Sequence, residues 1–472
     1  MGSQPLSVKR AEVEFHNFTS FGQPERTLRL YAEENARRGA IIRKHRQFIG
    51  PMTPFLEIGA NAGHSSYMLA NEFGADGFAL DLSADSLRYG KILQQTWGFE
   101  RAPVRVTGDA ANLPFADGSL RLVCAFQMLS QFLDMESVFR EVLRVLQPGG
   151  VFLFAEEWIK RLLSLRLYRA AYYNTMKPWE RRLHDWGLLG FVVRDAIGAR
   201  QEEGFGIRQN YSMRLQDWDA LVRKYFARQE YELFVPQTGW SERAVRQLAV
   251  RLDPNRSEWL AARLLGGTIA AVCRKAGPAP ESSGPSMDHF ELLLRCPDCK
   301  ASLLRESDVL FCSNCGYRAA NEDGVYNLLP SAERDELYPG ERDDIIDFSQ
   351  PHHEQHLIEG WYEIEGVFGN KYRWIGGRAI AKLRRVAAGP QRLRIRCHAP
   401  EQSVGSEVRA IVNGALAGSW KLDRKGVFVL ESDLLDAPEY TLEIQASPVW
   451  RVESDDRELT INISMIRLTP AP

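Results

Sequence analysis

The first 275 residues alternate short apolar runs with longer amphipathic runs. The apolar runs predict strands at 55–59, 77–83, 104–110, 120–126 and 151–157. Apolar residues spaced along one helical face predict helices at 64–73, 83–97, 135–150 and 213–226. Pro148 and Gly149-Gly150 are expected to end the third of these helices. This alternation predicts an α/β fold, a doubly wound parallel sheet covered by helices.

The C-terminal part of the chain has a different pattern. From about residue 358, apolar and polar residues alternate in short runs at 392–399, 407–414, 426–432, 440–447 and 458–468. Turn sequences lie between the runs, and Asn413-Gly414 is the clearest of them. The pattern predicts an all-β sandwich, similar to a jelly roll, over 358–472.

Two polar stretches divide the chain. Residues 276–288 contain three prolines, two glycines and three serines, which predicts a linker. Residues 331–357 are rich in Glu, Asp and His and predict a second, polar linker. The expected domains are therefore 1–275, a small cysteine-containing domain at 289–330, and the sandwich at 358–472.

The overall charge is balanced. The 472 residues include 59 Lys and Arg against 61 Asp and Glu, so no excess positive charge is available for phosphates and nucleic acid is not favoured as a partner. The N-terminus lacks the apolar core of a signal peptide, and no run of eighteen apolar residues could form a membrane-spanning helix. We therefore expect a cytoplasmic protein.

The loop after the first strand combines an acid with small residues. Glu57 precedes Gly59, Asn61 and Gly63 in the segment FLEIGANAGHS. Free backbone amides in such a loop can hold a pyrophosphate. The fixed negative charge of Glu57 would repel that group and favours a cationic or zwitterionic ligand instead.

Polar residues also end the neighbouring strands. Asp81, followed by Leu82, is placed to accept hydrogen bonds from both hydroxyls of a ribose. Asp109 and Ala110 could contact the amino group and edge of an adenine. The last polar residue of this set is Gln127, after the fourth strand. A ribose, an adenine and a positively charged tail together describe S-adenosylmethionine.

Four segments in residues 50–275 resemble the class I S-adenosylmethionine-dependent methyltransferases, in the small-molecule branch whose Rossmann-like sheet ends with an antiparallel strand. The segments are LEIGANAG, DLSADSL, GDAANLPFADGSL and EVLRVLQPGG. The resemblance implies that Glu57, Gly59 and Gly63 hold the methionine end of the cofactor and that Asp81 holds the ribose. It also implies that Asp109 and Ala110 contact the adenine.

The sequence departs from the family at two points. Asn61 stands where the family usually has a glycine; asparagine tolerates a left-handed backbone, but its side chain takes up space near the ligand. Ser130 and Gln131 stand where many relatives carry two histidines, so a histidine base is not available there.

The methyl acceptor requires alignment and, if it is a hydroxyl, a base. Glu156 at the end of the fifth strand is the first candidate base, and Glu203 is the second. Residues 158–212 form an insertion that predicts a helical lid. Between 158 and 184 this lid has seven basic residues and one acid, which suits an acidic acceptor or peripheral contact with a membrane surface. A solvated charged face is the alternative.

Four cysteines form two C-x2-C pairs separated by twelve residues: Cys296, Cys299, Cys312 and Cys315. This spacing predicts a structural zinc site with a closed shell of four thiolates, and a redox disulfide is the alternative. The segment resembles the zinc-ribbon partner protein of tRNA and release-factor methyltransferases. A second candidate metal site is PHHEQH (351–356), which contains three histidines; the alternative there is a hydrophilic linker.

The C-terminal segment resembles galactose-binding-like jelly rolls found beside glycan-modifying enzymes. Its Trp361, Tyr362 and Trp374 could stack on a sugar ring or pack in the core. We expect a methyltransferase that transfers a methyl group to a hydroxyl of a saccharide, glycan precursor or other small molecule. One alternative is a tRNA or protein methyltransferase with the zinc ribbon as docking module. The other is a glycan-binding adaptor with a degenerate methyltransferase fold.

Overall fold

The computed structural model describes residues 24–132, 134–160, 213–235, 240–278, 287–338, 342–348, 351–366, 371–452 and 455–470, with a few single positions such as Lys9. The chain forms two compact units. The first consists of Met1–Val13 and Leu28–Glu333, and the second of Glu14–Thr27 and Arg334–Pro472. Most of the predicted lid, with Glu203, lies outside the described residues.

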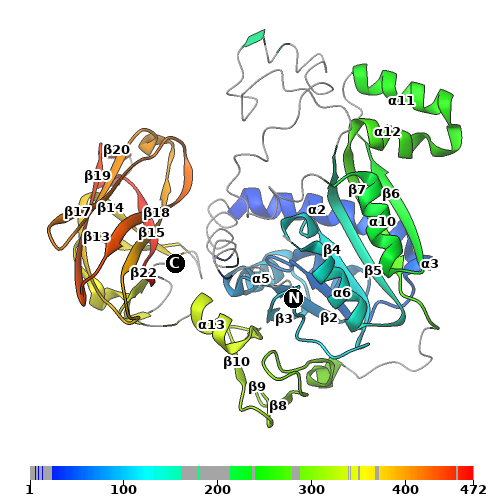
Figure 1. Ribbon diagram of the computed structural model, residues 1–472, viewed down its shortest axis with the longest axis horizontal. Coiled ribbons are helices and arrows are strands. Elements are labelled where there is room, and N and C mark those ends of the chain that lie inside the picture. Colours follow the sequence, from blue (N-terminus) through cyan, green and yellow to red (C-terminus); the bar gives the residue numbers. More distant parts are fainter. Residues whose placement is uncertain are drawn as a thin grey trace. The chain divides into compact units, whose positions relative to one another are not determined.

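The first unit is built on a mostly parallel sheet (Figure 1). Its parallel strands are β1 (Phe55–Ile58), β2 (Gly77–Asp81), β3 (Val104–Thr107), β4 (Leu120–Phe126) and β5 (Leu146–Ile159). At one side the sheet continues through β7 (Gly267–Arg274), antiparallel to β5, and β6 (Arg228–Phe234), which pairs with β7. The order is β6-β7-β5-β4-β1-β2-β3, so the predicted Rossmann-like sheet with an antiparallel strand near its end is confirmed.

The helices cover both faces of this sheet. They are α2 (Pro24–Lys44), α3 (Arg46–Ile49), α4 (His64–Glu72), α5 (Ala84–Trp97), α6 (Met135–Val145), α10 (Leu215–Tyr225), α11 (Trp240–Leu252) and α12 (Ser257–Leu265). Successive residues of β5 alternate between two cores. Phe152 and Phe154 join the core with α6 and α10, and Val151 and Leu153 join the core with α2 and α4.

One predicted helix is shorter than expected. The run at 135–150 ends as a helix at Val145, before Pro148, and Leu146 already belongs to β5. Leu146 pairs with Leu120 of β4, so the sheet takes up residues whose spacing still suits a helix. The serine cap expected at residue 83 is present, because Ser83 Oγ accepts a hydrogen bond from Ser86 N at 3.2 Å.

The cysteine module, residues 287–329, belongs to the first unit. It contains a 3-10 segment at Met287–Leu293 and four strands, β8 (Leu304–Glu306), β9 (Val309–Phe311), β10 (Arg318–Glu322) and β11 (Val325–Asn327). Strand β11 pairs in parallel with β3 and extends the sheet to eleven strands. The prediction of a separate domain at 289–330 is therefore corrected: backbone pairing and a shared apolar core join the module to the α/β sheet.

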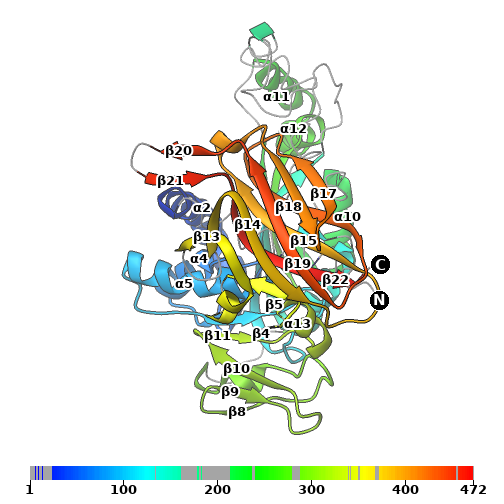
Figure 2. The same cartoon turned by 90° about the vertical axis from the view of Figure 1, so that its left-hand side faces the viewer.

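From β12 to β22 the second unit is built mainly of strands, which agrees with the predicted all-β region (Figure 2). Its sheet consists of β12 (Ile345–Asp347), β13 (Leu357–Glu365), β14 (Tyr372–Arg384), β15 (Gln391–Ala399), β16 (Glu407–Val412), β17 (Ala415–Lys421), β18 (Gly426–Leu435), β19 (Glu439–Ser447) and β22 (Asn462–Pro470). A separate pair is formed by β20 (Trp450–Val452) and β21 (Asp455–Leu459). The strands enclose one apolar core as a β-sandwich.

Two local predictions for this unit have different outcomes. Asn413 and Gly414 form the turn between β16 and β17, with φ values of 51° and 84°, which confirms the predicted hairpin. The predicted polar linker at 331–357 is wrong in part, because it contains α13 (Ser331–Leu337) and β12. Ile346 of β12 and the following Phe348 are fully buried in the sandwich core.

Within the described residues, no helix combines the length and the apolar character required to cross a membrane. The cytoplasmic location stays a prediction.

Candidate active site

The acidic residues singled out in the sequence meet at one edge of the first unit's sheet. Strand β1 lies between β2 and β4, and β3 follows β2, all in parallel. Glu57 is the third of the four residues of β1, Asp81 ends β2, and Asp109 comes two residues after β3. Because parallel strands end at the same edge, these three carboxylates lie at one edge of the sheet and form one candidate site. Gln127 follows β4 at this edge, with an exposed side chain.

The loop after β1 requires an unusual backbone. Gly59, Asn61 and Gly63 have φ values of 67°, 51° and 79°, all in the left-handed region. A Cβ added to Gly59 would lie 2.9 Å from Met128 Cβ, so this position has no room for a side chain. Asn61 adopts the left-handed conformation that the sequence analysis expected it to tolerate. Its side-chain oxygen accepts a hydrogen bond from the Tyr31 hydroxyl at 3.2 Å.

Glu57 is almost completely buried, with 1% of its surface exposed. Burial raises its pKa to about 7, and a hydrogen bond from Ser66 Oγ at 2.5 Å offsets part of that effect. The negative charge of the neighbouring Asp81 also raises the pKa of Glu57. The site therefore holds a buried carboxyl that a positively charged ligand would ionise.

Asp81 is fixed by two backbone amides. Its Oδ2 accepts a hydrogen bond from Asn61 N at 2.7 Å, and its Oδ1 accepts one from Ser83 N at 2.8 Å. The acid at the end of β2 is thereby tied to the loop after β1. Leu82 follows it in the chain and is half-buried.

The acid after β3 has an additional partner that sequence reasoning missed. Asp109 accepts hydrogen bonds from Ala111 N at 2.8 Å and from Lys9 Nζ at 2.7 Å. Lys9 is only 1% exposed and also contacts both carboxylate oxygens of Glu333, at 2.8 Å. Ala110 is buried beside Asp109. The contact of these two residues with an adenine stays a prediction.

Helix α2 brings a second polar cluster to the site. The Arg38 guanidinium lies 2.7 Å from His64 Nε2 and donates to Ser65 Oγ at 2.9 Å, both in the first turn of α4. Glu34 Oε2 lies 2.8 Å from His64 Nε2, and the ring of Tyr31 stacks on that of His64 with centroids 4.1 Å apart. Burial lowers the pKa of His64. Sequence reasoning missed this cluster, although Tyr31, Glu34 and Arg38 share one helical face.

Glu156, the first candidate base, is engaged by arginine. Its Oε1 accepts a hydrogen bond from Arg37 Nε at 3.1 Å, and its Oε2 accepts two from Arg38, at 3.0 and 2.8 Å. Its φ of 65° turns the chain within β5. The structure thus gives this carboxylate an anchoring contact, and its part as a base stays an untested prediction, as does that of Glu203.

The neighbouring Glu157 supports the backbone of the site. It is fully buried and accepts hydrogen bonds from the amides of Met128, Leu129 and Ser130, at 2.7 to 3.2 Å. Burial raises the pKa of Glu157 to about 7, although the hydrogen bonds from these amides lower it. Ser130 is therefore part of a short turn held by Glu157.

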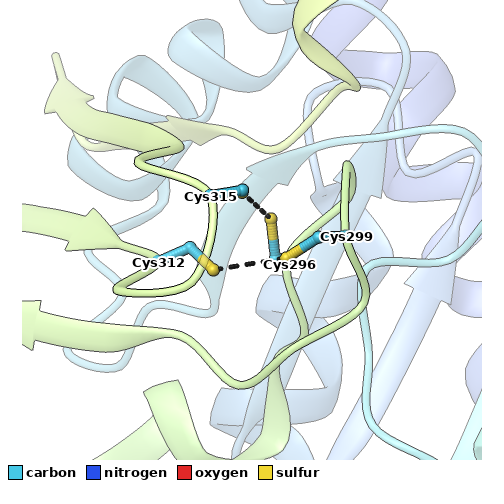
Figure 3. Close-up of side chains that lie close together, drawn as sticks. All are labelled: Cys296, Cys299, Cys312 and Cys315. Atoms are coloured by element: carbon cyan, nitrogen blue, oxygen red, sulfur yellow. Dashed lines mark hydrogen bonds between the residues drawn. The ribbon is translucent and has the colours of Figure 1, made fainter.

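The four clustered cysteines converge on one point (Figure 3). Their Sγ atoms all lie within 4.8 Å of one another, and the pairs Cys296–Cys315 and Cys299–Cys312 are each 3.5 Å apart. All seven cysteines of the chain are free thiols. Four sulfurs at this spacing fit a tetrahedral metal shell.

Two turns of the same form present these sulfurs. Lys300 and Gly316, each directly after the second cysteine of its pair, have φ values of 66° and 78°. Each donates its amide to the carbonyl of the first cysteine of the pair, at 3.0 Å. Among the described residues, no other group of three or more His, Cys, Asp or Glu side chains is arranged to hold a metal ion. In the PHHEQH segment, His353 Nε2 instead accepts a hydrogen bond from Arg373 at 3.2 Å.

Trp361, Tyr362 and Trp374, the candidate sugar contacts of the second unit, have protein partners. Trp361 donates to Ile380 O at 2.7 Å and packs against Phe348, with ring centroids 5.5 Å apart. Trp374 donates to Glu365 at 3.2 Å, and Tyr362 lies under the guanidinium of Arg457, 5.4 Å away. Trp361 therefore serves the core.

The strand order and the loop after β1 define the Rossmann-like methyltransferase fold, and comparison with known proteins agrees. Residues 56–154 match the family described as methyltransferase domain. The chain thus contains a methyltransferase domain.

Curated relatives match this domain over part of their length. Norajmaline N-methyltransferase of Rauvolfia serpentina is 30% identical over 95 residues, which are 20% of this chain and 32% of that protein. Arsenite methyltransferase of Aquipseudomonas alcaligenes is 31% identical over 146 residues, 27% of this chain and 42% of that protein. Tocopherol O-methyltransferase of Arabidopsis thaliana is 28% identical over 130 residues, which are 28% of this chain and 35% of that protein. The chain thus spans less than half the length of each of these relatives.

The alignment with one solved structure, a putative methyltransferase from Bacillus halodurans, covers 50% of this chain and 99% of that chain. The sequence identity is 15% and the TM-score is 0.29.

Proposed function

We propose that the protein is an S-adenosylmethionine-dependent methyltransferase that methylates a hydroxyl of a saccharide, a glycan precursor or another small molecule. The observation that carries this proposal is the meeting of Glu57, Asp81 and Asp109 at neighbouring strand ends, around a loop with three left-handed residues. S-adenosylmethionine supplies a methyl group on a sulfonium. The residues present fit it, because Glu57 offers a buried negative charge and Asp81 a fixed acceptor for ribose hydroxyls.

The reaction is tested with labelled S-adenosylmethionine on extracts separated into glycan, lipid, RNA and protein fractions. Label in the glycan fraction supports the proposed acceptor. Label in RNA or protein would favour the docking alternative for the cysteine module instead. Failure to bind S-adenosylmethionine at millimolar concentration would favour the non-catalytic adaptor.

The affinity for S-adenosylmethionine is expected to rise with pH between about 6 and 8. Glu57 has a pKa of about 7 without ligand, and a bound sulfonium and ammonium favour its ionised form. Below pH 7, binding must therefore release a proton, which weakens affinity by up to about tenfold per pH unit. Calorimetry across this range measures the slope. In Glu57→Gln the slope should disappear; an unchanged slope in that variant would assign the pH effect to another group.

We further propose that the cysteine module binds a structural zinc ion, as a zinc ribbon does. The donor set supports this, since four thiols at mutual distances below 4.8 Å leave no ligand position for water or substrate. Metal analysis of the purified protein tests it.

For the second unit we propose a glycan-binding face, and a row of polar side chains supports it. Arg378, Gln445, Arg409 and Ser419 are direct neighbours across β14, β19, β16 and β17. Arg378, Gln445 and Arg409 line a hollow of about 320 Å³, together with Glu407 and Ser447. Arginines and acids balance there, with Arg409 2.8 Å from Glu407 and Arg378 2.9 Å from Glu443. Such a neutral polar surface suits a polyhydroxyl ligand more than an anion.

Arg409→Ala is expected to weaken retention on immobilised glycans by about tenfold, because it removes hydrogen-bond donors to a sugar. The matched control is Arg384→Ala, an exposed arginine six residues from Arg378 along β14. If both variants lost retention equally, the retention would depend on the overall positive charge of the unit and not on Arg409. No retention of the wild-type protein on any glycan would refute this face as a glycan site.

A further inference from the structure

Helix α2 places a buried cation, Arg38, next to the loop after β1, at the start of α4. Its guanidinium lies 4.7 Å from the centre of the Phe126 ring, at the end of β4. It contacts Ser65 at the start of α4 and Glu156 near the end of β5. Arg38 is only 4% exposed, and its positive charge lowers the pKa of Glu57. A buried cation therefore lies among the ends of β1, β4 and β5, next to the loop after β1.

A donor with an amino-acid end brings a carboxylate as well as two positive groups. Glu57 and Asp81 suit the positive groups and the ribose, but neither can accept the carboxylate, because like charges repel. A carboxylate taken into a buried site needs a cation with hydrogen-bond donors. Guanidinium supplies both, in the planar arrangement that a carboxylate matches.

The ion pairs around Arg38 allow an exchange of partners. In the structure, Arg38 lies between two carboxylates, Glu156 at 2.8 Å and Glu34 at 3.3 Å. Glu156 has a second cation, because Arg37 contacts its other oxygen at 3.1 Å. If Arg38 turned from Glu156 to a ligand carboxylate, Glu156 would keep Arg37 as its partner. The exchange would then leave the half-buried Glu156 paired with a cation.

We propose that Arg38 binds the carboxylate of the methyl donor and makes the site specific for donors that carry one. This inference rests on the proposed function and adds the residue that recognises the amino-acid end of the donor. Arg37 acts as the positioning residue that holds Glu156 when Arg38 changes partner.

The test compares S-adenosylmethionine with its decarboxylated analogue, which keeps the sulfonium and the amine. Calorimetry measures both affinities in the wild type and in Arg38→Met, Arg38→Lys and Arg37→Met. The wild type is expected to prefer S-adenosylmethionine by about 30-fold or more, the effect of a buried charge pair. Arg38→Met should lose most of this preference with little change for the analogue. Arg37→Met should lower the preference in part, because Glu156 would then lose its only remaining cation when Arg38 turns to the ligand.

Arg38→Lys keeps the charge without the planar fork and should reduce the preference in part. If circular dichroism shows that Arg38→Met does not fold, the Arg38→Lys variant alone tests the inference. An Arg38→Lys protein that prefers S-adenosylmethionine over the analogue as strongly as the wild type would overturn the inference. Equal weakening of both ligands in Arg38→Met, or no preference in the wild type, would also overturn it while leaving the proposed function intact. A wild type that binds neither ligand would refute the proposed function and this inference with it.

Discussion

Cys312→Ser is expected to lose the bound metal and to destabilise the whole first unit. Cys312 is 2% exposed and belongs to the same apolar core as strands β1 to β5, and β11 of its module pairs with β3. Loss of a structural metal is among the changes that cost about 4 kcal/mol or more. In a unit of this size that corresponds to a fall in Tm of about 6 °C or more. Calorimetric melting with parallel metal analysis measures both effects.

The matched control is Cys273→Ala, which alters a buried cysteine of the same core far from the cluster. This variant should retain its full metal content. A chelator added to the wild type should reproduce the Tm shift of Cys312→Ser. A metal-free Cys312→Ser protein that melts like the wild type would show that the module folds apart from the sheet.

Asp81→Ala should weaken binding of S-adenosylmethionine by about 1 to 3 kcal/mol, or about 5- to 150-fold in Kd. The substitution leaves the ribose hydroxyls without their acceptor. It also releases Asn61 N and Ser83 N, which fix the loop after β1 and the start of α5. Asp81→Asn retains one oxygen acceptor and should give a smaller loss. Calorimetry with purified variants provides the measurement.

The control for this experiment lies at the opposite end of the same strand. Asp76 directly precedes β2, is about half exposed and pairs with Arg101. Asp76→Asn should leave the affinity for S-adenosylmethionine unchanged, because it is separated from the site by the length of β2. If Asp81→Ala bound the donor as tightly as the wild type, the ribose would have to lie elsewhere.

The residues that sequence reasoning placed at the cofactor site owe their placement to local patterns. Apolar runs mark the strands, and in a parallel sheet the ends of successive strands meet at one edge, so Glu57 and Asp81 had to come close. The same holds for the cysteines, because each C-x2-C pair forms its own turn. Arg38 and Lys9 escaped prediction for the opposite reason. They reach the site from α2 and from the N-terminal segment, and no local spacing connects Lys9 with Asp109.

The sequence by itself determined the alternation of strands and helices, the acids at the strand ends, the left-handed loop and the pairs of cysteines. Each of these depends on residues close together in the chain, where periodicity and backbone conformation act directly. Only the tertiary structure decided that β11 joins β3, that the helix from Met135 stops at Val145, and that Glu156 lies against two arginines. These outcomes depend on backbone hydrogen bonds and ion pairs between segments far apart in the chain, whose partners are chosen when the chain folds together.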